Sequence, residues 1–153
     1  MYRHMSESWK SIWKEKAGEI RQRAIAWRRG PTIVRLKKPT RIDRARRLGY
    51  KAKQGFVVVR IRVARGGMRK SRPRSGRRPK HLGVVKIKAA VSMQKVAERR
   101  VAEKFPNLKV LSSYLLYRDG KYSWYEVILV DPHHPSIKAD KDIIKRFPKI
   151  ASK

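Results

Sequence analysis

Hydrophobic residues recur at helical spacing in the first thirty residues, and Lys and Arg occupy many of the positions between them. The apolar positions are Trp9, Ile12, Trp13, Ile20, Ala24 and Trp27. The pattern predicts a helix that has Ser6 as its N-cap and ends at Gly30-Pro31. Gly18 costs a helix interior roughly 1 kcal/mol, so the sequence allows a division into two helices there. The first two tryptophans could stack on nucleic-acid bases, but aromatic residues at helical spacing more often pack inside a protein, and we favour packing.

An alternation of apolar and other residues between Gln54 and Val63 predicts a strand. One face carries Val57, Val59, Ile61 and Val63, and the other carries Phe56, Val58, Arg60 and Arg62. The second face becomes cationic toward the end of the strand. We therefore expect it to leave the core there and to reach a ligand surface.

The segment before this strand predicts a connector and a short helix. Residues 32–38 are predicted to be extended. Thr40 is the predicted cap of a helix with Asp43 in its first turn, and Gly49 follows its end. The role of Asp43 is then that of a first-turn residue or of a local partner for an arginine one turn later.

Further elements are predicted downstream. Ser92 caps a helix that runs to about Phe105, with an apolar face formed by Met93, Val96, Ala97, Val101 and Phe105. Residues 109–117 and 121–130 form two strands joined at Asp119-Gly120, a pair typical of a type I′ turn. Residues 84–88 are a candidate short strand, and the chain from Asp131 onward is a turn, a short helix and a tail.

These elements predict an α+β fold with a small, mainly antiparallel sheet packed with helices, an N-terminal helical segment and long basic extensions. We expect one domain over residues 1–153. Its predicted parts are an N-terminal helical segment (1–30), a basic linker with a short helix (31–55), an α+β core (56–131) that contains a basic loop (65–83), and a C-terminal segment (132–153).

The charge indicates a polyanionic partner. The formal net charge is +31 and the pI is about 11.5, and self-repulsion at such a charge opposes a compact state unless a polyanion neutralises it. Between residues 20 and 97 the sequence holds 26 of its 42 Lys and Arg residues and one acid, Asp43. Nucleic acid is the first candidate partner and an anionic membrane surface the second. No apolar run approaches the roughly 20 residues of a membrane-spanning helix, no signal-peptide pattern is evident, and cysteine is absent.

The basic loop, residues 65–83, holds eight Lys or Arg residues and no acid. Such a segment cannot form a core of its own, so we expect it to be disordered in isolation. Long loops in compact domains are uncommon unless they are functional. We therefore expect this loop to fold on binding, between phosphate-rich strands.

Catalytic chemistry is not predicted. His133 and His134 are the only clustered histidines, and a turn is a better interpretation than a metal site because no further ligand is near in sequence. The sequence has none of the GxxxxGK[ST], GxGxxG, HExxH or GxSxG motifs. We expect no metal, no cofactor and no small-molecule substrate.

Several sequence blocks in one order resemble a ribosomal protein family. PTRIDRARRLGYKAKQG (39–55) and VVVRIRVARGG (57–67) are similar to the signature of large-subunit protein fifteen of the archaeal and eukaryotic type, which is distinct from the bacterial protein of that number. The resemblance continues in QKVAER (94–99), FPNLKVL (105–111), EVILVDP (126–132) and HP (134–135), and the FPN and HP spellings are closer to archaeal members. The family normally continues into a segment with a tryptophan and a Gly/Arg/Lys-rich tail. This sequence has KADKDIIKRFPKIASK instead, so no contact of that tail is assigned to it.

The resemblance implies a non-catalytic structural component of the large subunit in the cytoplasmic ribosome, bound to ribosomal RNA and neighbouring ribosomal proteins, with an α+β fold. It implies phosphate contacts by the basic signature and the end of the strand, and packing or stacking by Tyr50. The residues expected to bind RNA are Arg41, Arg44, Arg46, Arg47, Tyr50, Lys51, Lys53, Arg60, Arg62, Arg65, Arg69, Lys70, Arg72, Arg74, Arg77, Arg78 and Lys80. An architectural, chromatin-type DNA-binding protein is the alternative that composition allows, and an RNA-processing enzyme is a third that the missing catalytic groups disfavour.

Overall fold

The computed structural model describes residues 2–15, 17–66, 71–84 and 91–146. These residues contain one four-stranded antiparallel sheet in the order β1-β2-β4-β3. The strands are β1 (Ile33–Leu36), β2 (Phe56–Ala64), β3 (Lys109–Arg118) and β4 (Tyr122–Val130). The helices are α1 (Tyr2–Glu15), α2 (Ala17–Arg29), α3 (Ile42–Arg47), α4 (Met93–Lys104), α5 (Pro135–Lys138) and α6 (Lys141–Arg146), with a short 3₁₀ helix at Pro79–His81. The predicted α+β class and antiparallel sheet are confirmed.

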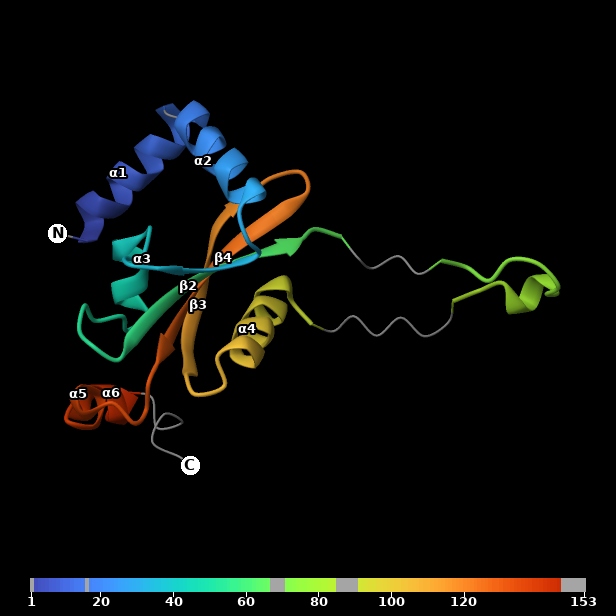
Figure 1. Cartoon of the computed structure of the whole chain (residues 1–153). Coiled ribbons are helices and arrows are strands. Elements are labelled where there is room, and N and C mark those ends of the chain that lie inside the picture. The colour runs from blue at the N-terminus through green and yellow to red at the C-terminus, as the bar shows by residue number, and fades with distance from the viewer. Residues whose placement is uncertain (1, 16, 67–70, 85–90, 147–153) are drawn as a thin grey trace.

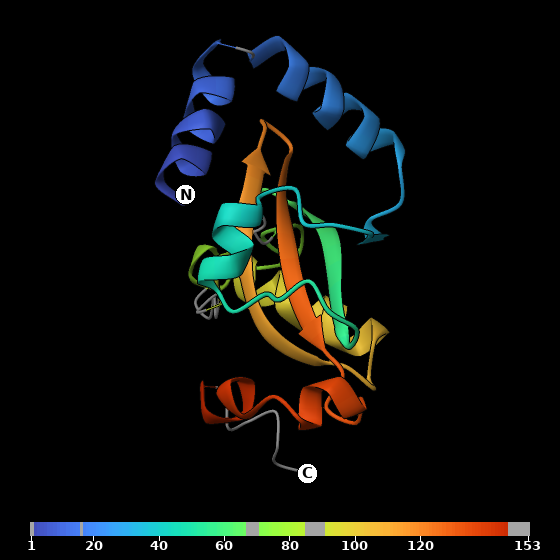
Figure 2. The same ribbon diagram turned by 90° about the vertical axis from the view of Figure 1, so that its left-hand side faces the viewer.

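Helices cover both faces of the sheet, and β4 lies between them. Helix α4 packs on one face, while α1, α2 and α3 lie on the other, with α5 and α6 beyond its lower end (Figures 1 and 2). Every β4 residue after Tyr122 is buried because the strand is central in the sheet and covered on both sides.

The α4 side holds the largest apolar cluster. Val59 and Ile61 of β2 pack with Ala97 and Val101 of α4, and all four side chains are fully buried. This confirms the predicted inward face of the strand and the predicted apolar face of the helix. The Ser92 hydroxyl accepts a hydrogen bond from the Lys95 backbone N–H at 3.2 Å, which confirms the predicted cap.

The opposite face holds three smaller clusters, one for each group of helices. Each is built on buried residues of the β3–β4 hairpin: Leu116 and Trp124 beside Ala24, Tyr114 and Ile128 beside Ala45, and Val130 beside Ile137 and Ile143. The sheet therefore provides a separate packing site for the N-terminal helices, for the arginine-rich helix α3 and for the C-terminal helices.

The N-terminal prediction is right in type and wrong in its start. Helix α1 begins at Tyr2, so Ser6 lies inside the helix and is not its cap. The predicted division is confirmed, but the two helices meet around residue 16, itself outside the described residues, and not at Gly18. Trp9 packs against the sheet cluster as predicted, whereas the side chain of Trp13 lies outside the described part.

The predicted connector over residues 32–38 contains strand β1, which the sequence analysis missed. Ile33 pairs with Ile61 and Leu36 with Val58, and the Arg62 backbone N–H donates to the Thr32 carbonyl at 2.9 Å. Strand β1 has only four residues, too few for an alternation of apolar and polar positions to be recognised. Its stability comes chiefly from pairing with β2, which the sequence does not display.

The predicted β3–β4 hairpin is confirmed, but its turn type is wrong. Neither Asp119 nor Gly120 has the positive φ that a type I′ turn at this pair requires. The Asp119 carboxylate instead accepts hydrogen bonds from the backbone N–H groups of Lys121, at 2.8 Å, and Tyr122. This Asx-type side-chain bonding shapes the turn.

The segment before α4 and the C-terminal segment were also predicted from the sequence. The candidate strand at residues 84–88 lies, except for Val84, outside the described residues. The C-terminal turn is confirmed, but it is followed by two short helices in place of one.

Candidate nucleic-acid interface

The arginine-rich helix α3 is attached to the sheet by its apolar side. Ala45 is fully buried against Tyr114 and Ile128. The helix ends in a Schellman motif, in which the N–H groups of Gly49 and Tyr50 donate to the carbonyls of Arg46 and Ala45, each at 3.0 Å. Gly49 has a φ of 99°, so the predicted end of the helix is confirmed.

The start of α3 differs from the prediction. Arg41 occupies the N-cap position and makes no side-chain capping bond. The Thr40 backbone N–H points to the Glu126 carboxylate of β4, at 3.1 and 3.4 Å from its two oxygens. A buried carboxylate from a distant strand therefore anchors this end of the helix, and the Thr40 capping prediction is wrong.

Glu126 lies at the centre of a buried polar cluster. It is fully buried, and it accepts a hydrogen bond from the Tyr114 hydroxyl. Burial raises the pKa of Glu126, while the bonds from Thr40 and Tyr114 oppose the rise. Burial, and next the adjacent carboxylate, raise the pKa of Tyr114 well above its usual range. Arg60 pairs with Glu126 across the strands, and its own pKa is lowered by burial and partly restored by that carboxylate.

Asp43 and Arg41 form an ion pair at 3.1 Å, with Asp43 buried. The Arg41 guanidinium also lies over the Trp9 ring, 5.2 Å from its centroid. Asp43 lies in the first turn of α3, which confirms the first of its two predicted roles, and the ion pair described is with Arg41 at the helix start. The arginines at positions 44, 46 and 47 are exposed.

Two predicted RNA-binding lysines are held by an acid from the C-terminal segment. The Asp140 carboxylate accepts hydrogen bonds from the ammonium groups of Lys51, at 2.9 Å, and of Lys53. Both bonds lower the pKa of Asp140, and the bond from Lys53 has the larger effect. The bond to Asp140 in turn raises the pKa of Lys51. The two lysines therefore connect the end of the basic signature to the α5–α6 segment.

The cationic face of β2 is covered by α2 and the hairpin. Arg60 lies over the Trp27 ring at 4.6 Å and Arg62 over the Tyr122 ring at 4.8 Å. The Arg62 guanidinium also donates to the carbonyl of Arg28. Arg65 donates to the Asp119 carbonyl at 2.6 Å. Aromatic rings and a carbonyl therefore contact Arg60 and Arg62, while Ala64 and Arg65 beyond them are exposed, and a ligand surface at this end stays a prediction.

Residues 71–83 of the basic loop stand apart from the sheet in Figure 1. Arg77 donates to the carbonyls of Arg74 and Ser75, and Ser75 and Gly76 both have positive φ in a local turn. The cations of this part are exposed: Arg72, Arg74, Arg77, Arg78 and Lys80. The predicted Arg69 and Lys70 lie outside the described residues.

The histidines form a turn. The His133 backbone N–H donates to the Asp131 carboxylate at 2.9 Å, and the His134 Nδ1 accepts from the Ser136 N–H at 3.2 Å at the start of α5. Within the described ranges, no three or more His or acidic residues are grouped so that they could hold a metal ion.

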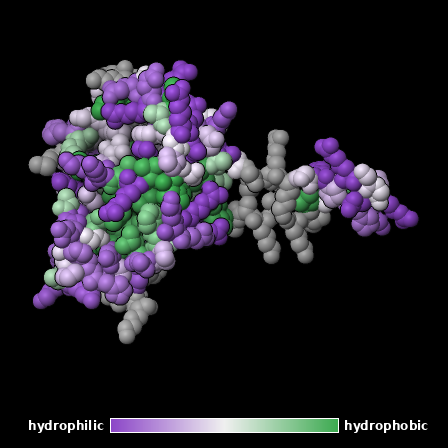
Figure 3. Space-filling model, in the orientation of Figure 1, coloured by the Kyte–Doolittle hydropathy of each residue, from purple (hydrophilic) through white to green (hydrophobic). Residues whose placement is uncertain are grey.

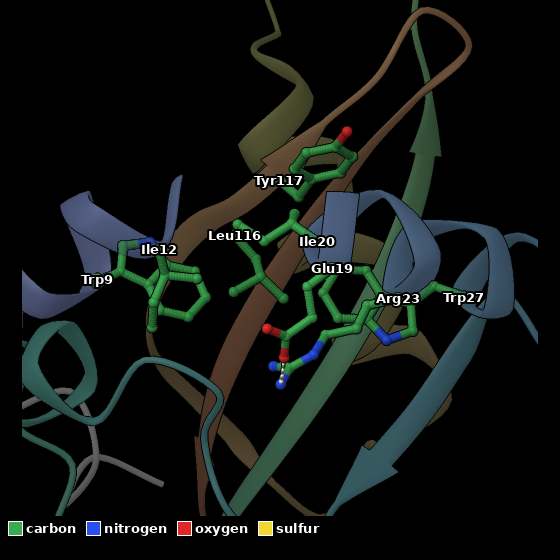
Figure 4. A pocket seen from close by; sticks show the side chains of 8 residues that line it. All are labelled: Trp9, Ile12, Glu19, Ile20, Arg23, Trp27, Leu116 and Tyr117. Carbon is green, nitrogen blue, oxygen red and sulfur yellow. Dashed lines mark hydrogen bonds and ion pairs between the residues drawn. The ribbon is translucent and has the colours of Figure 1, made fainter. Parts of the chain in front are cut away.

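A cavity of about 40 Å³ lies between α1, α2 and β3 (Figure 4). Its lining is mainly apolar, with Trp9, Ile20 and Leu116 around it and the Glu19–Arg23 ion pair on one side. Ligand pockets usually measure about 300–1,000 Å³, so this space is a packing defect under the N-terminal helices.

The surface of the molecule also has an apolar area. Figure 3 shows it at the centre of one face, surrounded by hydrophilic residues.

A comparison with known protein families decides which family the chain belongs to. Residues 1–145 match the family model Ribosomal_L15e, described as Ribosomal L15. The chain belongs to the ribosomal L15e family. Membership confirms the resemblance drawn from the sequence, and it implies a structural, non-enzymatic protein of the large subunit of the cytoplasmic ribosome, associated with ribosomal RNA and proteins. None of the helices within the described ranges has the length and apolar character needed to cross a bilayer.

The L15e fold divides the predicted RNA-binding residues into two groups. The first group makes internal contacts: Arg41, Lys51, Lys53, Arg60, Arg62 and Arg65. The second is exposed on α3 and the described part of the loop: Arg44, Arg46, Arg47, Arg72, Arg74, Arg77, Arg78 and Lys80. Tyr50 is half-buried and packs edge-to-face on Phe56.

Two exposed cations of this L15e chain were missed at the edge of the sheet. Arg35 lies on β1 and Lys37 follows it. The signal for both was present, because they lie in the long span whose only acid is Asp43. The sequence pattern does not single them out, because it predicts a connector where the structure has β1.

Proposed function

We propose that this L15e family member stabilises folded ribosomal RNA by binding its phosphate backbone with the exposed arginines of α3 and the basic loop. The observation that carries the proposal is the arrangement of α3. Its buried acid, Asp43, is neutralised by Arg41, while Arg44 and Arg46 are exposed and have no carboxylate partner within the described residues.

Internal contacts give these cations a fixed position. Helix α3 is only six residues long, and a helix of that length has little stability alone. Ala45 on its inner side and Glu126 at its start bind it to the sheet, and the Schellman motif closes its end. A rigid platform loses less conformational entropy on binding than a flexible basic tail does.

Recognition is then mainly of shape and backbone. Guanidinium groups bind phosphates with two parallel hydrogen bonds, so an arginine can bridge strands of separate RNA helices. Folded RNA presents phosphates and 2′-hydroxyls more readily than base edges. The loop, rich in arginine and glycine, folds between such strands on binding.

Competition between structured ribosomal RNA and duplex DNA of equal length tests this function against the alternative of architectural DNA binding. We expect clear preference for the structured RNA, and co-sedimentation of the full chain with large subunits that survives a high-salt wash. Equal affinity for both nucleic acids, together with release in the wash, would favour the DNA-binding alternative. Family membership argues against that alternative.

A further inference from the structure

A hollow of about 310 Å³ opens at the edge of the sheet where β1 ends. Strand β1 covers β2 only as far as the pair Leu36–Val58, whereas β2 begins two residues earlier, at Phe56. The uncovered start of β2 forms one wall, and Tyr50, just after α3, forms another. The volume is within the range of about 300–1,000 Å³ that is usual for ligand sites.

The charge of the hollow is positive and not neutralised. Arg35 and Lys37 line it, both are exposed, and neither has a hydrogen-bond or ion-pair partner within the described residues. None of its described lining residues is acidic. An anionic group is therefore the ligand that these two side chains favour.

Two aromatic residues, Tyr50 and Phe56, also line the hollow. The rings of Tyr50 and Phe56 lie 5.7 Å apart at 80°, and both residues are half-buried. In an edge-to-face pair, each ring keeps at least one flat face that the other does not cover. Flat aromatic faces bind unstacked nucleobases of any sequence.

We propose that this hollow binds one unpaired nucleotide of RNA, with its phosphate at Arg35 and Lys37 and its base against the Tyr50–Phe56 pair. The proposal rests on the RNA-binding function proposed above, and adds a site on β1 that recognises single-stranded character. A base inside a duplex is stacked and paired, so a regular helix offers this hollow only a phosphate.

Photochemical cross-linking of the full chain tests the position of the base. The probe is an unstructured RNA that contains 5-iodouridine, and the adducts are mapped by peptide mass spectrometry. We expect an adduct on Tyr50 or Phe56 with the single strand and none with a duplex of the same length. Adducts confined to residues outside the hollow would overturn the proposal.

Paired substitutions separate this hollow from general charge. We expect the double variant Arg35→Ala/Lys37→Ala to lose about tenfold more affinity for the single strand than for the duplex. The single strand loses its stacked base together with the phosphate contact, whereas the duplex loses only the phosphate contact, and tenfold is within the range of one stacked base. The matched control, Arg100→Ala/Lys104→Ala, removes the same two charges from the exposed side of α4. It should weaken both RNAs equally. Tyr50→Phe should keep the preference for the single strand and Tyr50→Leu should lose it.

The outcomes distinguish the two proposals. No binding of either RNA by the wild-type chain at physiological salt would overturn the general RNA-binding function. Strong binding with equal losses in the β1 and α4 double variants would overturn the hollow alone. A third measurement is the acetylation of Lys37 in the presence of RNA or of an oligoglutamate peptide. If the peptide protects Lys37 as strongly as RNA does, an acidic protein segment is the occupant, and the nucleotide proposal is overturned. If Tyr50→Leu is unfolded by circular dichroism, the cross-link and the double variants decide.

Discussion

The backbone N–H of Thr40 lies 3.1 Å from a carboxylate oxygen of Glu126, a residue 86 positions away in the sequence. Glu126 is completely buried in the central strand β4, and Thr40 lies two residues before α3. The contact therefore fixes the start of the arginine-rich helix to the middle of the sheet. Glu126 is one of only 11 acidic residues in a chain of net charge +31, and it is buried inside the protein.

Replacement of Glu126 by Ala should destabilise the fold strongly. It removes the acceptor for the Thr40 N–H and for the Tyr114 hydroxyl, and an unsatisfied buried polar group costs about 1–3 kcal/mol. Glu126→Gln should cost less, because its amide oxygen still accepts from Thr40, and its amide nitrogen donates to Tyr114, whose hydroxyl turns to the Arg41 carbonyl at 3.4 Å. Urea unfolding at fixed ionic strength measures both. An equal loss in the two variants would contradict this account.

The stability of the wild-type chain should fall as the pH rises above the ordinary Glu pKa of 4.5, because burial raises the pKa of Glu126 in the folded state. Between the ordinary and the raised pKa, the folded state binds more protons than the unfolded state, so stability decreases with pH across that window. Below the window, the full stabilisation from this group is present. The quantity to measure is the difference in unfolding free energy between the wild type and Glu126→Gln from pH 4 to 8. A difference that does not change with pH would contradict the raised pKa.

Local patterns in the sequence predicted the elements whose burial follows one period. Strand β2 alternates, helix α4 carries a capped apolar face, and both lie where the pattern indicates. Strand β1 was not predictable, because its stability comes from pairing with β2 and not from its own four residues. The same limit applies to the start of α3, where a carboxylate from β4 replaces the expected local cap.

The charge pattern predicted a binding surface but not which cations remain available. Arg44 and Lys51 are equally basic in the sequence and lie within one short signature. Both are exposed, and only the fold brings Asp140 to Lys51 and leaves Arg44 without a carboxylate partner among the described residues. Contacts between residues almost 90 positions apart leave no periodic trace, so such a division cannot be read from a single chain.

Gly55 should tolerate no side chain, for two separable reasons. Its φ is 89°, a conformation that costs other residues roughly 1–2 kcal/mol, and an added Cβ would lie 2.5 Å from Cγ1 of the buried Ile137. Gly66 is a matched control, since its φ is 80° but an added Cβ meets nothing within 4 Å. We expect Gly55→Ala to lower the thermal midpoint clearly more than Gly66→Ala. Equal shifts would show that backbone strain alone acts, and that the contact with Ile137 adds nothing.

The division between exposed and internally held cations predicts different salt dependences for two double variants. If about eight phosphates are engaged, log K against log salt should have a slope of roughly −5 to −7 for structured ribosomal RNA. Arg44→Ala/Arg46→Ala should reduce the size of this slope by roughly 1.4 to 1.8, because two phosphate contacts disappear. The measurement is a titration of labelled RNA at several salt concentrations.

Lys51→Ala/Lys53→Ala removes the same net charge but should leave the slope nearly unchanged, because both ammonium groups are bound to Asp140 in the free chain. Its effect should be on stability, since the bonds between this segment and the C-terminal helices are lost. The matched charge makes the comparison decisive, because any effect of overall electrostatic attraction is the same in both variants. A similar decrease in slope for the two would mean that Lys51 and Lys53 leave Asp140 to bind phosphates, and that the internal contacts do not select which cations meet the RNA.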